Sequence, residues 1–227
     1  MFRYGYYRHF CNPHDKITEA SLLFFNFNFL IFPMSLHQDA ELKKAVLELP
    51  QKEKDKLLVR LISKDKMLMK QLHFQLLENE YDLEERIDKL RKQLAQLFDI
   101  GTSQIGNTPH HSNFIGLSKL VKQASGLVNE HEKVTKDKTS EAEFRFYILQ
   151  RVIGDYERLF DSSYQSAAHK LHKYITGRIK HAVGKYDKLH EDFQFDYRED
   201  FQNALHAFGN TTLKSYISEQ RIELDLN

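Results

Sequence analysis

The sequence predicts an all-α fold: an irregular multi-helix bundle or a HEAT-like helical stack of about eight to nine helices. Apolar residues recur at spacings of three and four through most of the chain, which is the period of an amphipathic helix. The 227 residues include only four Pro and nine Gly, so long segments run without a helix breaker. No segment alternates apolar and polar residues over the length of a strand, and no period identifies a repeat family.

Composition narrows the classes of function. With 41% hydrophobic residues the chain can bury a sizeable core, and its net charge of +1 argues against a generally basic nucleic-acid coat protein. Its single cysteine, Cys11, excludes an intramolecular disulfide framework and a multi-cysteine zinc site. No window offers the roughly 20 apolar residues of a membrane span, so we expect a cytoplasmic protein without a membrane partner.

Residues 1–33 differ in kind from the rest of the chain. They are rich in Phe and Tyr, and their apolar run from Ser21 to Phe32 is too short for a membrane span. The run lacks the cleavage pattern of a signal peptide. We therefore expect residues 1–33 to be a non-native extension and Met34 the true start. A membrane or secretory signal and an ordered extension are the alternatives.

Residues 34–100 are predicted to form an N-terminal helical half of four helices. Ser35 with Gln38 resembles a capping box for the first helix. Pro50 ends that helix and can open the second, and Asp65 is a suitable cap for the third. We expect the second helix to bury its apolar stripe, formed by Leu57, Leu58, Leu61 and Ile62.

The fourth helix is predicted to begin at Asp82, with Glu85 completing a capping box. Its apolar residues follow heptad spacing: Leu83, Ile87, Leu90, Leu94 and Leu97. This pattern indicates a seam inside a bundle, and a dimerising seam is the alternative.

Residues 101–112 are predicted to be a linker, because Gly, Asn, Thr and Pro gather where the periodicity stops. Residues 113–227 then form a C-terminal helical half, which we expect to pack with the first as one domain. Its helices include one with a capping box at Ser140 and Glu143, and a last short one capped by Asn210 or Thr211. The helix before that last one is expected to bury Phe193, Tyr197, Phe201, Leu205 and Phe208.

The segment from Tyr164 to His190 shows the clearest pattern in the chain. Its apolar side consists of Leu171, Ile175, Ile179, Ala182, Tyr186 and Leu189. Its other side carries the candidate anion-binding residues Lys170, Lys173, Arg178, Lys180, His181, Lys185 and Lys188. The only acid between Ser162 and His190 is Asp187, so the basic side is mostly uncompensated. It could follow a phosphate backbone, or it could be a solvated lysine face neutralised by the acidic segment from Glu191 to Asp200.

The other polar clusters in the sequence do not indicate a catalytic or metal site. His169 and His172 lie at i and i+3, but no third ligand stands at helical spacing to complete a metal site. The acids Asp192, Asp196, Glu199 and Asp200 fall opposite the aromatic face of their helix, where a solvated surface must lie. The chain contains no phosphate-binding loop, dinucleotide fingerprint or nucleophile motif, and we expect no cofactor.

Three segments resemble a family of uncharacterised all-helical bacterial proteins, some of which carry the label deoxyuridine triphosphate nucleotidohydrolase. The similar segments are Leu49 to Glu78, Ala124 to Lys138 and His190 to Asp200. The resemblance covers Met34 onward and implies an all-helical fold. The all-α dUTP pyrophosphatases hold magnesium with paired ExxE and ExxD carboxylates, and this chain has no ExxE, so the resemblance carries over no catalytic residue.

Two functions follow as expectations. The first is a non-catalytic helical interaction or scaffold protein that binds a protein partner or itself, because the strong signals are packing signals. The second is a phosphate-directed protein that binds nucleotide or nucleic acid along the basic helix, with nucleotide hydrolysis as a further option.

Overall fold

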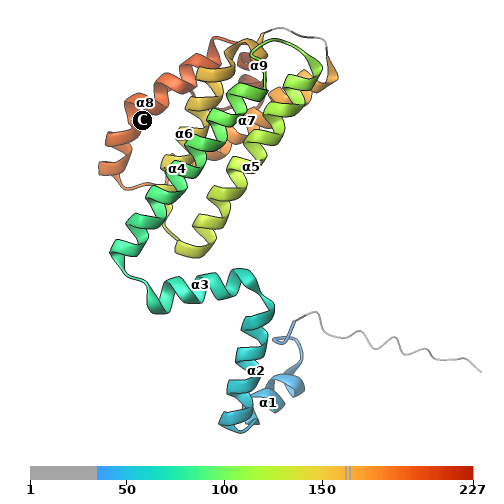
Figure 1. The fold of residues 1–227 in the computed structure, drawn as a ribbon, viewed down its shortest axis with the longest axis vertical. Helices are drawn as coiled ribbons and strands as arrows, with labels where there is room; N and C mark the ends of the chain where they lie inside the picture. The colour runs from blue at the N-terminus through green and yellow to red at the C-terminus, as the bar shows by residue number, and fades with distance from the viewer. Residues whose placement is uncertain (1–34, 162, 164, 227) are drawn as a thin grey trace, which may run out of the picture. The chain divides into compact units, whose positions relative to one another are not determined.

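The computed structural model describes residues 35–161, 163 and 165–226. Its contacts divide the described residues into two compact units, with the boundary between Asp55 and Lys56. No strand occurs among the described residues, which confirms the all-α prediction. In chain order their helices are α1 Ala40–Glu48, α2 Gln51–Lys64, α3 Lys66–Leu77, α4 Glu80–Gln104, α5 His111–Thr135, α6 Lys138–Tyr156, the 3-10 helix η1 Glu157–Phe160, α7 Ser166–Tyr186, α8 Glu191–Gly209 and α9 Leu213–Glu219 (Figure 1).

The cap of α1 differs from the prediction. The Asp39 carboxylate accepts a hydrogen bond from the Leu42 amide at 2.9 Å, so Asp39 is the N-cap. The predicted capping box at Ser35 and Gln38 is wrong because these residues form a turn before the helix, closed by a 3.0 Å bond from the Gln38 amide to the Ser35 carbonyl. Asp and Ser are similarly favoured at the N-cap position, and in this structure Asp39 occupies it.

The start of α2 agrees with the prediction. The Pro50 carbonyl accepts hydrogen bonds from the amides of Glu53 and Lys54 at 2.9 and 3.1 Å, so Pro50 stands at the N-terminus of the helix. Asp65 caps α3 as predicted, since its carboxylate accepts from the amides of Met67 and Leu68.

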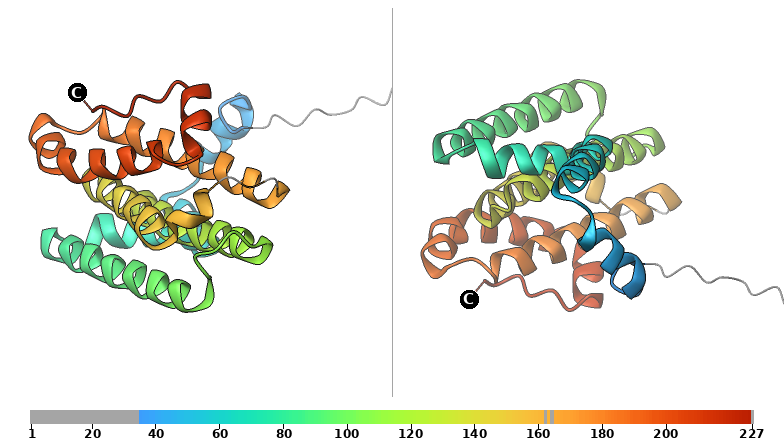
Figure 2. Two further views of the ribbon diagram at one scale, coloured as in Figure 1. Left: turned by 90° about the horizontal axis from the view of Figure 1, so that it is seen from above. Right: turned by 90° about the horizontal axis from the view of Figure 1, so that it is seen from below.

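In the second unit α5 lies at the centre. It contacts α3, α4, α6 and α7, while α6 also contacts α4 and α8. The substantial contacts join helices one or two places apart in the chain, and Figure 2 shows α6 between α4 and α8. One continuous core results, and its largest fully buried side chains include Phe98, Phe114, Phe144, Tyr156, Phe160, Tyr186, Phe201 and Phe208.

The heptad stripe of α4 faces this core. Leu90 and Leu94 are buried, and Ile87 and Leu97 pack against the core cluster, as predicted for a bundle seam. The helix begins at Glu80 rather than Asp82.

The capping box of α4 therefore uses other residues than those predicted. The Asn79 side chain accepts from the Tyr81 amide at 2.8 Å, and the Asp82 carboxylate accepts from the Asn79 amide at 2.9 Å. Asp82 is thus the third helical residue of the box and not its cap.

The connection between α4 and α5 is shorter than the predicted linker, residues 101–112. The helix α4 continues to Gln104, and α5 already begins at His111. Gly101 lies inside α4 and is buried. A Cβ at this position would meet Leu120 Cδ2 at 2.7 Å. This glycine serves a close contact between helices, and the sequence pattern alone made it look like a loop residue.

The helix α6 is buried on nearly all sides, and its cap also differs from the prediction. The Asp137 carboxylate accepts from the amides of Thr139 and Ser140 at 3.1 and 3.3 Å. Ser140, the predicted cap, is buried and forms a 2.9 Å hydrogen bond with His131 Nε2 instead. The reason is the tight α5–α6 turn, which starts α6 three residues earlier.

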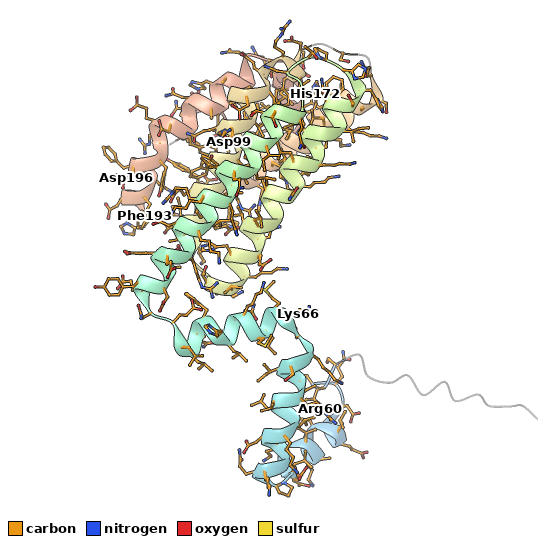
Figure 3. All side chains as sticks on the ribbon, in the orientation of Figure 1. Arg60, Lys66, Asp99, His172, Phe193 and Asp196 are labelled. Atoms are coloured by element: carbon orange, nitrogen blue, oxygen red, sulfur yellow. The ribbon has the colours of Figure 1, made fainter. Side chains whose placement is uncertain are left out.

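The C-terminal helices follow the predicted pattern with two exceptions. Leu171, Ile175, Ile179, Ala182 and Tyr186 of α7 are buried, as predicted. Phe201, Leu205 and Phe208 of α8 are buried too. Phe193 was predicted to be buried but is exposed. The part of α8 before Phe201 contains no buried residue, and Figure 3 shows Phe193 and Asp196 at the outer edge of this helix. The N-cap of α9 is Thr212 and not the predicted Asn210 or Thr211, although the Thr211 hydroxyl accepts from the Leu213 amide at 3.2 Å.

The second half of α2 does not bury its stripe, contrary to the prediction. Leu58 and Leu61 are 56% and 51% exposed, and α2 and α3 contain no buried residue. The helix α3 packs on the end of α5 through polar contacts: Lys70 pairs with Glu130, and Gln71 Nε2 donates to the Lys133 carbonyl at 2.9 Å. Periodicity indicated amphipathic helices correctly, but it did not reveal that Leu58, Leu61, Leu76 and Leu77 stay exposed.

None of the helices among the described residues has both the length and the apolar character needed to cross a membrane. The proposed extension, residues 1–33, and the proposed start at Met34 lie outside the described residues.

Candidate anion-binding site

The basic side of α7 divides into two groups in the structure. Lys170, Lys173 and Lys180 of α7 are exposed, and so is Lys188, which lies in the turn after the helix ends at Tyr186. Arg178, His181 and Lys185 are partly buried, because they lie at the edge of α7 that packs against α5 and α6. Only the second group meets polar residues of other helices, so the structure brings together three of the seven predicted residues.

At this edge Glu141 of α6 is the central carboxylate. It is 1% exposed, and its two oxygens accept hydrogen bonds from Arg145 Nη2 and Lys185 Nζ, each at 2.6 Å. Burial by itself raises the pKa of the Glu141 carboxyl, but the hydrogen bonds from Lys185 and Arg145 outweigh burial and lower that pKa below its usual value. Glu141 is therefore ionised, and it neutralises one of the two cations beside it.

Arg145 completes the buried part of the site. It is 7% exposed, and its Nη2 also donates to Asn129 Oδ1 of α5 at 2.9 Å. Sequence reasoning missed both Glu141 and Arg145. Their i and i+4 spacing favours an ion pair on a helix, but the same helix carries a second such pair, Arg151 and Asp155, so the sequence alone did not show which pair is buried.

Arg178 is held by an aromatic ring and not by a carboxylate. Its Cζ lies 5.3 Å from the centre of the Tyr174 ring, and Lys122 Nζ of α5 lies 5.5 Å from the same ring. Such cation–π contacts orient a cation without neutralising it. The Arg178 Nε is buried and has no acceptor among the described residues.

A small cavity lies between these groups. It has a volume of about 10 Å³ and is lined by Ser125, Arg145, Ile148, Leu149, Arg178 and His181. The pKa of His181 is lowered by burial and by the positive charges of Arg145, Lys185 and Arg178, while Glu141 acts weakly in the opposite direction. The cavity wall therefore has a positive potential, and His181 is neutral near pH 7.

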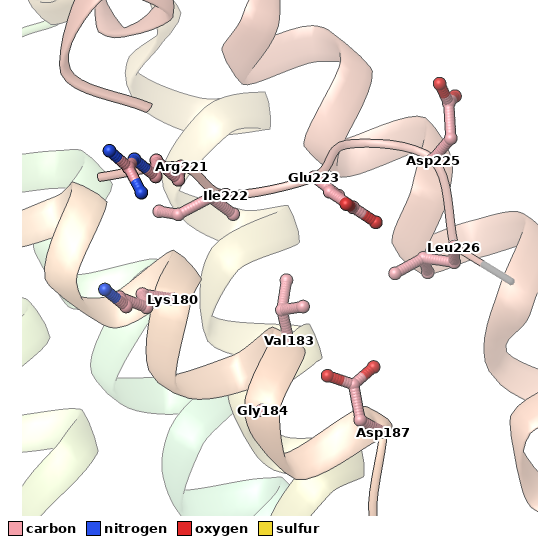
Figure 4. A pocket seen from close by; sticks show the side chains of 9 residues that line it. All are labelled: Lys180, Val183, Gly184, Asp187, Arg221, Ile222, Glu223, Asp225 and Leu226. Atoms are coloured by element: carbon pink, nitrogen blue, oxygen red, sulfur yellow. The ribbon is translucent and has the colours of Figure 1, made fainter. Parts of the chain in front are cut away.

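Lys180 belongs to a different surface. With Val183, Gly184 and Asp187 it lines a pocket of about 420 Å³ that the C-terminal segment closes with residues 221–226 (Figure 4). Lys180 Nζ lies 3.5 Å from the Gln220 carbonyl. Because the pocket is lined by Lys180 and Arg221 as well as by Asp187, Glu223 and Asp225, its charge is mixed and it favours neither anions nor cations.

The remaining predicted polar clusters have structural partners or face outward. His172 Nε2 donates to the Leu159 carbonyl at 3.0 Å, and His169 Nδ1 lies 2.8 Å from the Tyr216 hydroxyl. The acids Asp192, Asp196, Glu199 and Asp200 are exposed, and in the described chain none of them pairs with a lysine of α7. Within the described ranges, no three His, Cys, Asp or Glu residues converge on a position that could hold a metal ion.

Comparisons of the chain with known protein families, with curated proteins and with solved structures found no match.

Proposed function

We propose that the protein is a non-catalytic helical interaction protein whose α2 and α3 bind a protein partner. One observation carries this proposal: Leu58, Leu61, Leu76 and Leu77 are each more than half exposed. Single exposed leucines are normal on soluble proteins, but several on consecutive helices form an apolar surface of the kind that partners cover.

The chemistry of α2 narrows the partner. Leu57, Leu58, Leu61 and Ile62 form one stripe at helical spacing, which is the pattern by which an amphipathic helix docks into an apolar groove. Beside this stripe, residues 56–64 carry Lys56, Arg60 and Lys64 and no acid. A groove with an acidic rim is therefore the complementary surface.

A second copy of the chain is one partner with that chemistry. On α8, Phe193 and Phe195 are exposed, the latter by 77%, beside Asp192, Asp196 and Glu199. Aromatic side chains among carboxylates complement leucines among lysines and arginines, so self-association belongs to the proposal as its simplest form.

A photo-crosslinking residue at position 61 of the full chain tests the proposal in the native cell. We expect products that do not form when the same residue replaces Lys119, which is exposed on α5. The double variant Leu58→Glu with Leu61→Glu, tested with the crosslinker at the neighbouring position 62, should lose these products and keep the parent melting temperature, because both leucines are exposed. Identical products at positions 61 and 119 would contradict the proposal.

A second candidate is phosphate-directed binding of nucleic acid or nucleotide along α7, with hydrolysis of a bound nucleotide as its enzymatic form. The supporting observation is that α7 contains no acid, and that Lys170, Lys173, Lys180 and Lys188 form no ion pair within the described chain. Uncompensated lysines on one helix supply sequence-independent affinity that falls steeply with salt.

Titration with labelled single- and double-stranded oligonucleotides at low and moderate salt tests this candidate. Changing Lys170, Lys173, Lys180 and Lys188 to Glu should abolish binding. The matched control changes four exposed lysines on other helices to Glu: Lys89, Lys92, Lys119 and Lys214. Equal loss in both variants would mean that overall charge, and not α7, governs binding.

A further inference from the structure

We propose that Ser125, Arg145, Arg178 and His181 form a binding site for one phosphoryl group, with one of its oxygen atoms inserted in the cavity between them. This inference stands apart from both proposed functions, because it uses neither the apolar surface of α2 and α3 nor the exposed lysines of α7.

The first argument is the unused hydrogen-bonding capacity of the cavity wall. Among the described residues, no hydrogen bond reaches the Ser125 hydroxyl, the Arg178 guanidinium or the imidazole of His181, and the Arg178 Nε is fully buried. A buried donor without an acceptor typically costs about 1–3 kcal/mol. The Arg178 Nε is such a donor and lies at the wall of the cavity, which is the arrangement expected of a site that a ligand completes.

The second argument is the balance of charge. The cations Arg145, Arg178 and Lys185 surround one carboxylate, Glu141, whose two oxygens already accept from Arg145 and Lys185. Arg178 therefore has no counter-ion in the cluster, and an anion would supply it. Guanidinium groups favour phosphate because their planar N–H donors match its oxygens.

The third argument concerns water as the alternative occupant. A water molecule accepts two hydrogen bonds and donates two, but the two arginines at the wall supply donors only, since arginine has no acceptor. A phosphate oxygen accepts several hydrogen bonds and donates none when ionised. The positive charge of the two arginines thus favours the oxyanion.

Size and access define the ligand. A cavity of about 10 Å³ has room for a single small atom such as an oxygen and excludes a base or a sugar. Arg145 is buried at its floor, whereas Arg178 and His181 are partly exposed. A phosphoryl group would therefore approach past Arg178 and His181, and the rest of its molecule would stay outside.

Titration of the full-length protein with inorganic phosphate, followed by calorimetry at constant ionic strength with chloride as the reference anion, tests the site. We expect saturable phosphate binding that Arg178→Gln weakens by about tenfold, the value of one charge-assisted hydrogen bond. The matched control is Lys119→Gln, which removes the same charge from an exposed position of α5, the helix that carries Ser125. Its affinity should stay within about twofold of the parent protein.

Arg178→Gln should fold normally because Arg178 makes no hydrogen bond to a described residue, and a melt checks this. If it does not fold, Ser125→Ala serves instead, with the same expected weakening. The proposal is overturned if phosphate binds no better than chloride, or if Lys119→Gln weakens binding as much as Arg178→Gln.

The source of the phosphoryl group is resolved by competition. A nucleoside 5′-monophosphate presents a terminal monoester, whereas an oligonucleotide without end phosphates presents only internal diesters. Displacement of inorganic phosphate by the monoester alone identifies a free or terminal phosphate as the ligand. Displacement by the oligonucleotide as well identifies a nucleic-acid backbone, and failure of both to displace it limits the site to the free ion.

Discussion

Gly101 marks the closest approach of α4 to its neighbours. A Cβ at this position would meet Leu120 Cδ2 at 2.7 Å and the Tyr156 hydroxyl at 3.1 Å. The Leu120 side chain can move a little, but Tyr156 is fully buried, and its hydroxyl has no hydrogen-bond partner among the described residues. Added volume at Gly101 must therefore displace packed core atoms.

We expect Gly101→Val to lower the free energy of unfolding by about 1–3 kcal/mol, as overpacked core positions do. The matched control is Gly126→Ala in α5, where a Cβ has no neighbour within 4 Å. Because Ala loses less backbone entropy than Gly, this control should gain about 0.4–1 kcal/mol. Chemical denaturation of both variants measures the difference, and a neutral Gly101→Val would show that α4 can move away from α5.

Glu141 shows what a buried ion pair requires. Its carboxylate is 1% exposed and accepts from both Arg145 and Lys185. Glu141→Gln keeps the shape but removes the charge, which leaves Arg145 buried without a counter-ion. We expect a loss of about 3–5 kcal/mol in the free energy of unfolding.

The control for Glu141→Gln is Glu130→Gln, which breaks the pair with Lys70 on the surface. Both partners of that pair are about half exposed, so its loss should cost no more than about 1 kcal/mol. Denaturant melts of the two variants compare the pairs directly. Equal costs would mean that water reaches Glu141 in solution.

At the scale of the elements, the apolar period predicts helices better than it predicts what covers them. In α4 the heptad stripe faces the core, and Leu90 is buried. In α2 the apolar residues also recur at helical spacing, yet Leu61 is half exposed. The apolar period of a sequence shows only that one side of a helix is apolar. Whether another element covers that side depends on the tertiary structure.

Matched leucine truncations test this difference. Leu90→Ala should lower the free energy of unfolding by about 2–5 kcal/mol, because it leaves a cavity in the core. Leu61→Ala should change it by no more than about 0.5 kcal/mol, as expected at an exposed position. Denaturant melts over a range of protein concentrations check both values. A large cost for Leu61→Ala that grows with concentration would mean that α2 is buried between molecules.

Helix ends and the candidate site were harder to predict than the helices. Asp39, Asn79 and Asp137 cap α1, α4 and α6, whereas the sequence pattern favoured Ser35, Asp82 and Ser140. Several polar residues near a helix start have similar capping ability, so local sequence does not choose among them.

The site depends on contacts that the sequence does not contain. The pattern of α7 identified Arg178, His181 and Lys185 as basic residues on one side. It gave no reason to separate them from Lys170 and the other exposed lysines, because that separation arises from the packing of α7 on α5 and α6. Glu141 and Arg145 join the site from α6, and only the tertiary structure brings them there.

At the scale of the whole molecule, three partly or fully buried histidines link folding to pH. Burial is the largest influence on His131, His172 and His181, and it lowers the pKa of each below the ordinary value. In the unfolded chain a histidine takes up a proton near pH 6.5. Between that value and the lower folded pKa, the unfolded state binds more protons than the folded state, so stability falls as the pH decreases.

Glu78 acts in a separate pH range. Its hydrogen bonds with Arg86 are the main reason that the pKa of its carboxyl is lowered to about 2. The stability from this pair is complete above the unfolded pKa, near 4.3, and is lost only as the pH falls from there toward 2. A loss of stability that begins near pH 6.5 therefore comes from histidines and not from Glu78.

We expect the melting temperature of the full chain to fall steadily from about pH 7.5 to about pH 5.5. His172→Gln should reduce this dependence, because glutamine can still donate to the Leu159 carbonyl but cannot take up a proton in this range. The control, His111→Gln, removes an exposed histidine at the start of α5. Thermal melts at three pH values compare the slopes of the parent and the two variants. If His172→Gln leaves the slope unchanged while His111→Gln reduces it, the pH dependence comes from the surface, and the buried imidazoles do not govern it.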